Sequence, residues 1–196
     1  MAFYIFPQAI QKVECKKLLN YCLKNSLQFN WQKTLCQFIR IHLKMIKSSL
    51  IISTYNWPQA LELVLISVKR QHVLPTEVII ADDGSTNETK ELIESFKADF
   101  PIPLIHVWHE DQGFNKSMIL NKAIIKSNGD YIIQSDGDCI LHASFVKDHL
   151  SFLKKNQYLF GSRVNIQAHH LKRLFSEKQI KFNPFSKGIK KRTRAL

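Results

Sequence analysis

The chain contains little glycine, proline and cysteine for its length. Its 196 residues include six glycines, six prolines and four cysteines, while 45% of them are hydrophobic. So few glycines and prolines in so hydrophobic a chain exclude a disordered, collagen-like or repeat-array protein. The length is typical of one ordinary domain that buries a core of its own.

Cysteine pairs and long apolar runs are also absent. No two cysteines have CxxC spacing, which excludes a disulfide framework or a zinc site and indicates reduced thiols in a cytosol. Residues 1–10 lack the regions of a secretory signal, and the apolar runs are too short to cross a bilayer. We therefore expect a cytoplasmic protein, with peripheral contact at the inner face of the membrane left open.

Acidic residues are scarce only in the two flanks of the chain. The 28 basic and 16 acidic residues give a net charge of +12, which read alone suggests a nucleic-acid or anionic membrane partner. Residues 1–44 carry +6 and residues 162–196 carry +9, whereas residues 45–161 carry −3. Because the middle is slightly acidic, we expect no nucleic-acid partner and keep a basic nucleic-acid-binding protein as the less favoured alternative.

Between residues 48 and 164, short β-rich apolar runs alternate with stretches of helical periodicity. The predicted strands are 50–54, 77–81, 104–108, 131–134 and an edge strand over 158–160. The predicted helices are 58–71, one that opens with a capping box of Ser85 and Glu88, 114–126 and 143–155. This alternation predicts βαβ units and an α/β protein with a mostly parallel sheet.

Polar residues follow four consecutive strands, at the edge where such sheets bind ligands. They are Thr54, Tyr55 and Asn56, then Asp82 and Asp83, then Glu110 and Asp111, and finally Asp136 and Asp138. The Asp136-Gly137-Asp138 turn would direct two hard oxygen ligands into one crevice, as Mg²⁺ or Mn²⁺ prefers, although aspartate is also a common turn former. Asp82 and Asp83 could accept hydrogen bonds from a base or ribose, or could cap the next helix, and residue type does not rank them.

Other site chemistry finds little support in the sequence. No GxGxxG or GxxxxGK[ST] motif occurs, which argues against a dinucleotide or P-loop site and favours phosphates held by a metal. The histidines, among them His106 and His109, show no metal-ligand spacing, so we expect structural or solvated roles for them. Cys139 has no activating histidine pair and is predicted to line the crevice rather than to act as a nucleophile.

Three ordered motifs together resemble family 2 glycosyltransferases of the GT-A fold. They are residues 48–56, residues 77–86 and the stretch from Gly129 to Asp138. The resemblance covers about residues 46–164, and the segment 111–124 is similar to enzymes of the bacterial surface and capsular polysaccharide type.

This resemblance implies an inverting, metal-dependent transfer of a sugar from a nucleotide-diphosphate sugar to a glycan or lipid-linked acceptor. UDP is the expected nucleotide, and Mn²⁺ or Mg²⁺ is the implied cofactor. The implied donor-binding residues are Thr54, Tyr55 and Asn56 at the nucleotide, Asp82 and Asp83 at base and ribose, Asp111 and Asn121 at the diphosphate-sugar, and Asp136 and Asp138 as the DxD motif. Asp138 is the expected direct metal ligand.

The chain departs from the family pattern after the DxD motif. The family's downstream carboxylate base is not matched, since Asp148 and Glu177 are the only acids that follow Asp138, so the catalytic base is unknown. We expect a helical extension over 1–44, a GT-A domain over 45–164 and a basic tail over 165–196 that begins a truncated acceptor region. A donor-binding remnant without turnover is the main alternative. A phosphoribosyl-diphosphate site, which residues 79–86 also resemble, ranks low because the DxD motif has no place in it.

Overall fold

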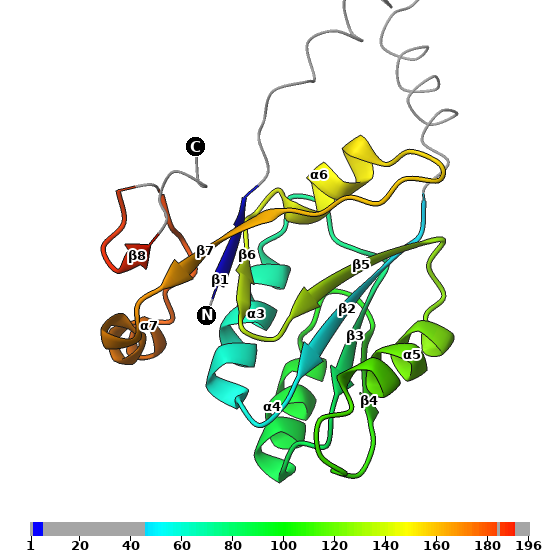
Figure 1. Cartoon of the computed structure of the whole chain (residues 1–196), viewed down its shortest axis with the longest axis horizontal. Helices are drawn as coiled ribbons and strands as arrows, with labels where there is room; N and C mark the ends of the chain where they lie inside the picture. The colour runs from blue at the N-terminus through cyan, green and yellow to red at the C-terminus, as the bar shows by residue number, and fades with distance from the viewer. Residues whose placement is uncertain (1, 6–45, 184, 191–196) are drawn as a thin grey trace, which may run out of the picture. The chain divides into compact units, whose positions relative to one another are not determined.

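The central feature of the structure is a four-stranded parallel sheet (Figure 1). A computed structural model describes residues 2–5, 46–183 and 185–190, and contacts divide the chain into residues 7–46 and a second unit that holds all other residues. In that second unit the strands β2 (Ser48–Thr54), β3 (Glu77–Asp82), β4 (Leu104–Trp108) and β5 (Tyr131–Asp136) pair in the order β4-β3-β2-β5. All three pairings are parallel, so the four carboxyl ends meet at one edge.

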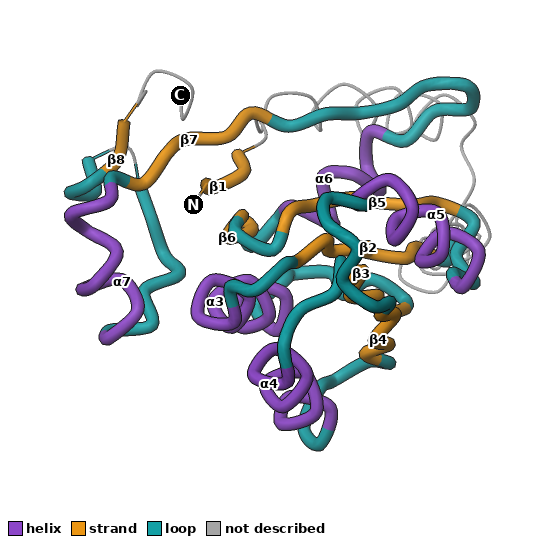
Figure 2. Tube along the Cα trace, turned by 60° about the horizontal axis from the view of Figure 1, so that its bottom comes forward, coloured by secondary structure: helices purple, strands orange, loops and turns teal. Residues whose placement is uncertain are grey.

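Helices cover both faces of this sheet because the central strands are apolar on both sides. The helices are α3 (Pro58–Lys69), α4 (Asn87–Lys97), α5 (Lys116–Lys126) and α6 (Phe145–Phe152). Leu50 and Ile52 of β2 belong to the core formed with α3, α4 and α6, whereas Ile51 packs in a second cluster with Ile119 and Ala123 of α5. Figure 2 shows α5 on the opposite side of the strands from α3 and α4. The sequence-based prediction of an α/β sheet flanked by helices is therefore confirmed.

A second sheet follows the DxD motif and includes the first residues of the chain. Its order is β6-β1-β7-β8, with strands β6 (Cys139–Leu141), β1 (Ala2–Ile5), β7 (Ser162–Ile166) and β8 (Ile189–Lys190). Strand β1 runs parallel to β6 and antiparallel to β7. Between β7 and β8 lie a short 3₁₀ helix (Ala168–His170) and α7 (Leu171–Ser176), and Leu174 of α7 packs with Ile140 and Val164. Residues 162–190 thus contain regular elements, and their apolar side chains share a core with Ile140 of β6 and Leu63 of α3.

Several predicted elements differ from the observed ones. The expected edge strand over 158–160 is absent from the described residues, and β7 begins instead at Ser162. The capping box is also wrong, because Thr86 is the N-cap of α4 and Ser85 accepts a hydrogen bond from the backbone of Asn56. Of the helical extension expected over 1–44, residues 2–5 form β1, and the rest lies outside the described residues. None of the described helices combines the length and hydropathy needed to span a membrane.

Candidate functional site

A cleft of about 390 Å³ opens at the carboxyl edge of the parallel sheet. It is there because the strands end together and the following loops must diverge toward helices on opposite faces. The described residues that line it are Ser53, Thr54, Tyr55, Trp57, Asp83, Gly113, Phe114, Lys116, Asp136, Gly137 and Asp138. The cleft thus joins the end of β2 with the turn between β5 and β6 and the loop before α5.

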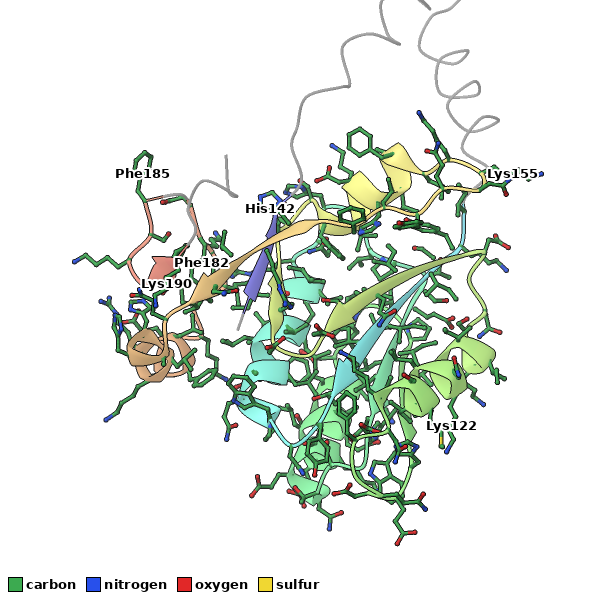
Figure 3. All side chains as sticks on the ribbon, in the orientation of Figure 1. Lys122, His142, Lys155, Phe182, Phe185 and Lys190 are labelled. Atoms are coloured by element: carbon green, nitrogen blue, oxygen red, sulfur yellow. The ribbon has the colours of Figure 1, made fainter. Side chains whose placement is uncertain are left out.

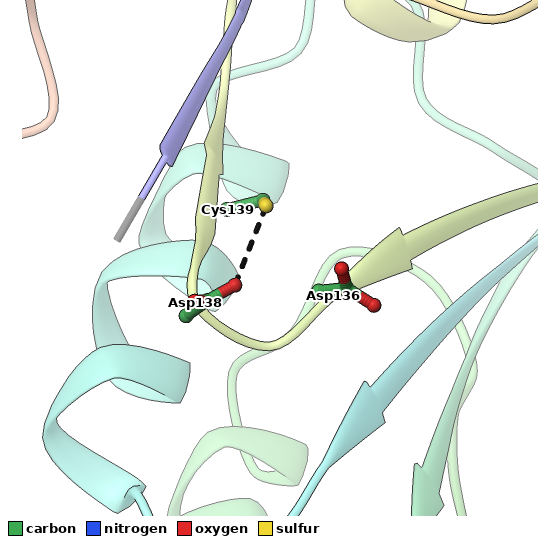
Figure 4. A group of neighbouring side chains, drawn as sticks. All are labelled: Asp136, Asp138 and Cys139. Carbon is green, nitrogen blue, oxygen red and sulfur yellow. Dashed lines mark hydrogen bonds between the residues drawn. The ribbon is translucent and has the colours of Figure 1, made fainter. Parts of the chain in front are cut away.

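The Asp136-Gly137-Asp138 turn packs directly on the end of β2. The backbone N–H of Gly137 donates to the carbonyl oxygen of Ser53 at 2.7 Å. A Cβ atom at Gly137 would lie 2.9 Å from that oxygen and 3.1 Å from the side chain of Thr54, so glycine is needed for this close approach. The turn places Asp136 at the end of β5 and Asp138 just before β6 (Figure 4).

Asp136 is held by cations. Its Oδ1 accepts a hydrogen bond from Lys116 at 2.6 Å and one from the hydroxyl of Ser53 at 3.1 Å, and Arg163 lies 3.8 Å from Oδ2. Burial acts to raise the pKa of the Asp136 carboxyl, but the bond and charge of Lys116, with Ser53 and Arg163, outweigh it and lower the pKa below its ordinary value. Asp136 is therefore ionised at neutral pH.

Asp138 is the second carboxylate of the cleft. The thiol of Cys139 donates a hydrogen bond to its Oδ1 at 3.4 Å (Figure 4). Burial, with the charge of Asp138, raises the pKa of the Cys139 thiol to about 12, so the sulfur is protonated at neutral pH. One ligand atom each from Asp136, Asp138 and Cys139 lie within 4.8 Å of one another. Two carboxylates in this arrangement fit a hard divalent cation that keeps part of its water shell.

The structure separates the roles of Asp82 and Asp83, which the sequence could not rank. Asp82 is fully buried and away from the cleft lining, where its carboxylate accepts from the backbone N–H of Ser85 at 2.9 Å and meets Nε2 of His106 at 2.8 Å. Asp83 lines the cleft, and its two oxygens meet Nε2 of His109 at 2.7 Å and the backbone N–H of Asn115 at 3.0 Å. Asp82 thus shapes the loop after β3, while Asp83 faces the cleft.

His109 has a partner on each ring nitrogen. Nζ of Lys122 lies 3.4 Å from Nδ1 of His109, and Nε2 of His109 faces Asp83. Lys122 belongs to α5 (Figure 3). An ammonium can only donate, so a hydrogen bond from Lys122 leaves Nδ1 as the acceptor and Nε2 as the protonated nitrogen that donates to Asp83. The structural role expected for the histidines therefore includes orienting a carboxylate of the cleft.

The other predicted residues lie at the rim or outside the lining. The hydroxyl of Tyr55, which is 52% exposed, donates to Asp111 at 2.9 Å. That bond raises the pKa of Tyr55. The pKa of Asp111 is lowered, mainly by the hydrogen bond from the backbone N–H of Gly113 and then by the bond from Tyr55. Asn56 and Asn121 are exposed, and the cleft-lining residues of the described chain include neither of them nor Asp111.

Four side chains at this site that sequence reasoning missed add aromatic surface or positive charge. Trp57 and the 88% exposed Phe114 add aromatic surface to the cleft, and Lys116 adds a cation. Arg163 reaches Asp136 from the second sheet, which no local pattern in the sequence announces. Of these residues, the sequence could have indicated only Lys116. A cation is unfavourable at a helix N-terminus, so a lysine in the first turn of α5 suggests a role outside the helix.

Part of this chain is similar in sequence to known bacterial proteins, and two of these illustrate the identity and the coverage. The uncharacterised glycosyltransferase YfnE of Bacillus subtilis (strain 168) is 34% identical over 105 residues, which are 53% of this chain and 26% of that protein. The poly(ribitol-phosphate) beta-N-acetylglucosaminyltransferase TarS of Staphylococcus aureus (strain Mu50) is 25% identical over 114 residues, 57% of this chain and 20% of TarS. The chain therefore spans about a quarter or less of the length of these relatives.

Among solved structures, the mannosyltransferase PcManGT from Pyrobaculum calidifontis, in complex with GDP-Man and Mn²⁺, shares the fold. Its TM-score is 0.50 at 22% identity, over 57% of this chain and 33% of the mannosyltransferase. Residues 49–194 match the family described as Glycosyl transferase family 2, so the match continues beyond residue 164, where the resemblance in motifs ends. With most of its length matched and the expected sheet and strand-end motifs present, the chain belongs to glycosyl transferase family 2.

Proposed function

We propose that this chain binds a nucleotide-diphosphate sugar, with UDP as the expected nucleotide, and transfers its sugar with inversion to a glycan or lipid-linked acceptor. The observation that carries the proposal is the convergence of Asp83, Asp136 and Asp138 in one cleft at the carboxyl edge of the sheet. The similar proteins support it by name, since PcManGT was solved with GDP-Man and Mn²⁺ and TarS is an N-acetylglucosaminyltransferase.

Different residues of the cleft would bind different parts of the donor. Asp83 is a hydrogen-bond acceptor for the base or ribose, held in place by His109 and the N–H of Asn115. Asp138, with Asp136 beside it, would hold Mn²⁺ or Mg²⁺, and such a metal when bound supplies positive charge to the departing diphosphate. Tyr55, expected at the nucleotide, bonds Asp111, expected at the diphosphate-sugar, so the two would contact adjoining parts of the donor at the rim. Thr54 lines the cleft, and its side chain packs closely against Gly137.

Donor binding without transfer is a second candidate, favoured by the positions of the later acids. The described acids after Asp138 are Asp148 on α6 and Glu177, which bonds Arg173 at 2.8 Å. Neither belongs to the described lining of the cleft. A carboxylate base for an acceptor hydroxyl would then have to come from the cleft acids themselves or from another polypeptide segment.

Calorimetric titration with UDP, GDP, ADP and CDP, each with and without Mn²⁺, tests donor binding. We expect one diphosphate to bind in the presence of Mn²⁺, and Asp138→Asn to weaken it at least ~30-fold because a charged metal ligand is lost. Asp130→Asn is the matched control, since exposed Asp130 precedes β5 at the opposite end of that strand. Absence of binding for all four diphosphates in the presence of metal would overturn the proposal.

Turnover separates the two candidates. Incubation with the nucleotide sugar whose diphosphate binds should release free nucleotide in the wild type and not in Asp138→Asn. Tight donor binding without release of nucleotide, either to water or to added glycan acceptors, would leave the donor-binding protein as the function of this chain.

A further inference from the structure

We propose that Lys116 is a donor-binding residue that presents its ammonium to the diphosphate, and that Asp136 serves mainly to hold this ammonium in the cleft. The inference rests on the proposed function and assigns a role to a residue outside the DxD motif. The two aspartates of that motif then have different roles: Asp136 binds the ammonium of Lys116, and Asp138 is the principal carboxylate for a metal.

The charge balance of the cleft requires a cation. Its described lining contains three acids, Asp83, Asp136 and Asp138, against one basic residue, Lys116. A nucleoside diphosphate is itself an anion, so carboxylates alone would repel it. Lys116 reduces that repulsion before any metal arrives, and Arg163 adds a second positive charge 3.8 Å from Asp136.

The geometry holds Lys116 in place for this task. Its Nζ lies 2.6 Å from Oδ1 of Asp136, and the two side chains are only 35% and 33% exposed. An ammonium has three donors, so the bond to Asp136 leaves capacity to donate to a phosphate oxygen in the same cleft. A half-buried, charge-assisted pair of this kind is more firmly fixed than a surface ion pair.

The position of Lys116 in its helix is otherwise unfavourable. Lys116 is the first residue of α5, and the first turn of that helix contains no acid. The helix dipole disfavours a cation at this end, so a local gain in helix stability does not explain the residue. Departures from local rules of this kind concentrate where a side chain has a task in a site.

The same contacts argue against Asp136 as the principal metal ligand. Its Oδ1 already accepts from Lys116 and from Ser53, while Oδ2 faces Arg163. A divalent ion that bound Asp136 directly would approach two positive side chains and compete with them. Asp138, the other aspartate of this turn and also part of the cleft lining, is then the principal carboxylate for a metal.

Ligands that differ only in the diphosphate test the inference. In calorimetry with Mn²⁺ present, Lys116→Gln should weaken UDP about tenfold or more, the effect of losing one charge-assisted hydrogen bond, and leave uridine unchanged. Lys116→Arg should keep the affinity for UDP within about threefold, because the charge remains. Lys126→Gln, an exposed lysine at the other end of α5, is the matched control and should change neither ligand. Equal loss of UDP and uridine, or no loss of UDP, would overturn the inference.

A second titration with Mn²⁺ alone keeps this result separate from the proposed function. Lys116→Gln should bind Mn²⁺ several-fold more tightly than the wild type, because a positive charge is removed and Oδ1 of Asp136 is released. Weaker Mn²⁺ binding would mean that Lys116 only organises the metal carboxylates, and would overturn the inference. If the wild type binds no diphosphate but Lys116→Gln still gains affinity for Mn²⁺, the proposed function fails while the Lys116–Asp136 pair stands.

Discussion

At the scale of single residues, the cleft depends on backbone contacts as much as on carboxylates. Gly137 lets the turn between β5 and β6 lie against the carbonyl of Ser53, and Gly84 lets the loop after β3 lie against Asp111. A Cβ at Gly84 would be 2.6 Å from Cα of Asp111, and its φ of +94° suits glycine. Asp83, Asp136 and Asp138 could not line the cleft as they do if these close backbone approaches were lost.

Gly137→Ala tests that dependence. The added Cβ would lie 2.9 Å from the oxygen of Ser53, so we expect the free energy of unfolding to fall by about 1–3 kcal/mol, as in other overpacked sites. Urea denaturation measures this loss, and the same variant should bind UDP more weakly because Asp136 and Asp138 shift. A variant as stable as the wild type would contradict the tight packing of this turn.

His149, on α6, is a buried titratable residue away from the cleft lining. It is 6% exposed, and its Nδ1 lies within hydrogen-bond distance, 3.0 Å, of the hydroxyl oxygen of Tyr131. Burial lowers the pKa of His149 from 6.5 to about 4, while burial raises the pKa of Tyr131, which stays neutral.

The stability of the protein should fall as the pH drops from 6.5 to 4. In this window the unfolded chain binds a proton at His149 that the folded chain does not, so acid favours unfolding by up to roughly 3 kcal/mol. His149→Gln should flatten the dependence, whereas exposed His169→Gln should not. Urea midpoints measured at half-unit pH steps give the slope, and an unchanged slope in His149→Gln would count against the buried neutral imidazole.

At the scale of elements, α5 shows how one helix serves both the core and the site. Its first residue, Lys116, lines the cleft, while Ile119 and Ala123 pack on Ile51 and Ile79 of the sheet. Burial of that apolar stripe fixes the helix, and the helix in turn fixes where the ammonium of Lys116 can reach.

Two isoleucines of α5 make a matched pair of variants. Ile119 is fully buried, so Ile119→Ala should lower the free energy of unfolding by about 2–5 kcal/mol through lost burial and a cavity. Ile125 on the same helix is 85% exposed, and Ile125→Ala should change it by no more than ~0.5 kcal/mol. Similar losses in both variants would refute the packing of α5 described here.

At the scale of the whole described unit, segments distant in sequence form the second sheet. Strand β1 lies between β6 and β7, so residues 2–5 bridge strands more than 130 positions away. Parts of the basic flanks therefore belong to regular structure, and Arg163 of β7 brings its charge to Asp136. The net charge of the flanks describes their composition without telling which charges reach the cleft.

Deletion of residues 1–5 tests this arrangement. Loss of the strand between β6 and β7 should expose the amides of residues 162–164 to hydrogen exchange, because Asn165 and Ile166 alone of β7 also pair with β8. The amides of β2 and β3 should stay protected by their own ladder. Substitution of the same five residues by other β-branched and aromatic residues should retain protection. Unchanged exchange in β7 after the deletion would show that β1 is not a partner of that strand.

The elements that can be predicted from the sequence are those that depend on patterns over a few neighbouring residues. Strand 104–108 was predicted at its observed bounds, and the other three strands of the parallel sheet were placed within two residues at each end. The edge strand over 158–160 failed because a run of exposed aromatics satisfies strand propensity without a partner strand. The 84% exposed Tyr158 and 83% exposed Phe160 stack on each other instead.

By itself, the sequence determined the α/β class and the edge of the sheet where the acids gather, because both follow from periodicity over a few residues. Only the tertiary structure decided that Asp83 faces the cleft while Asp82 is buried against His106. It also decided that Lys116 and Arg163 meet at Asp136. Contacts between residues so far apart depend on how helices and sheets pack, and no local pattern records that packing.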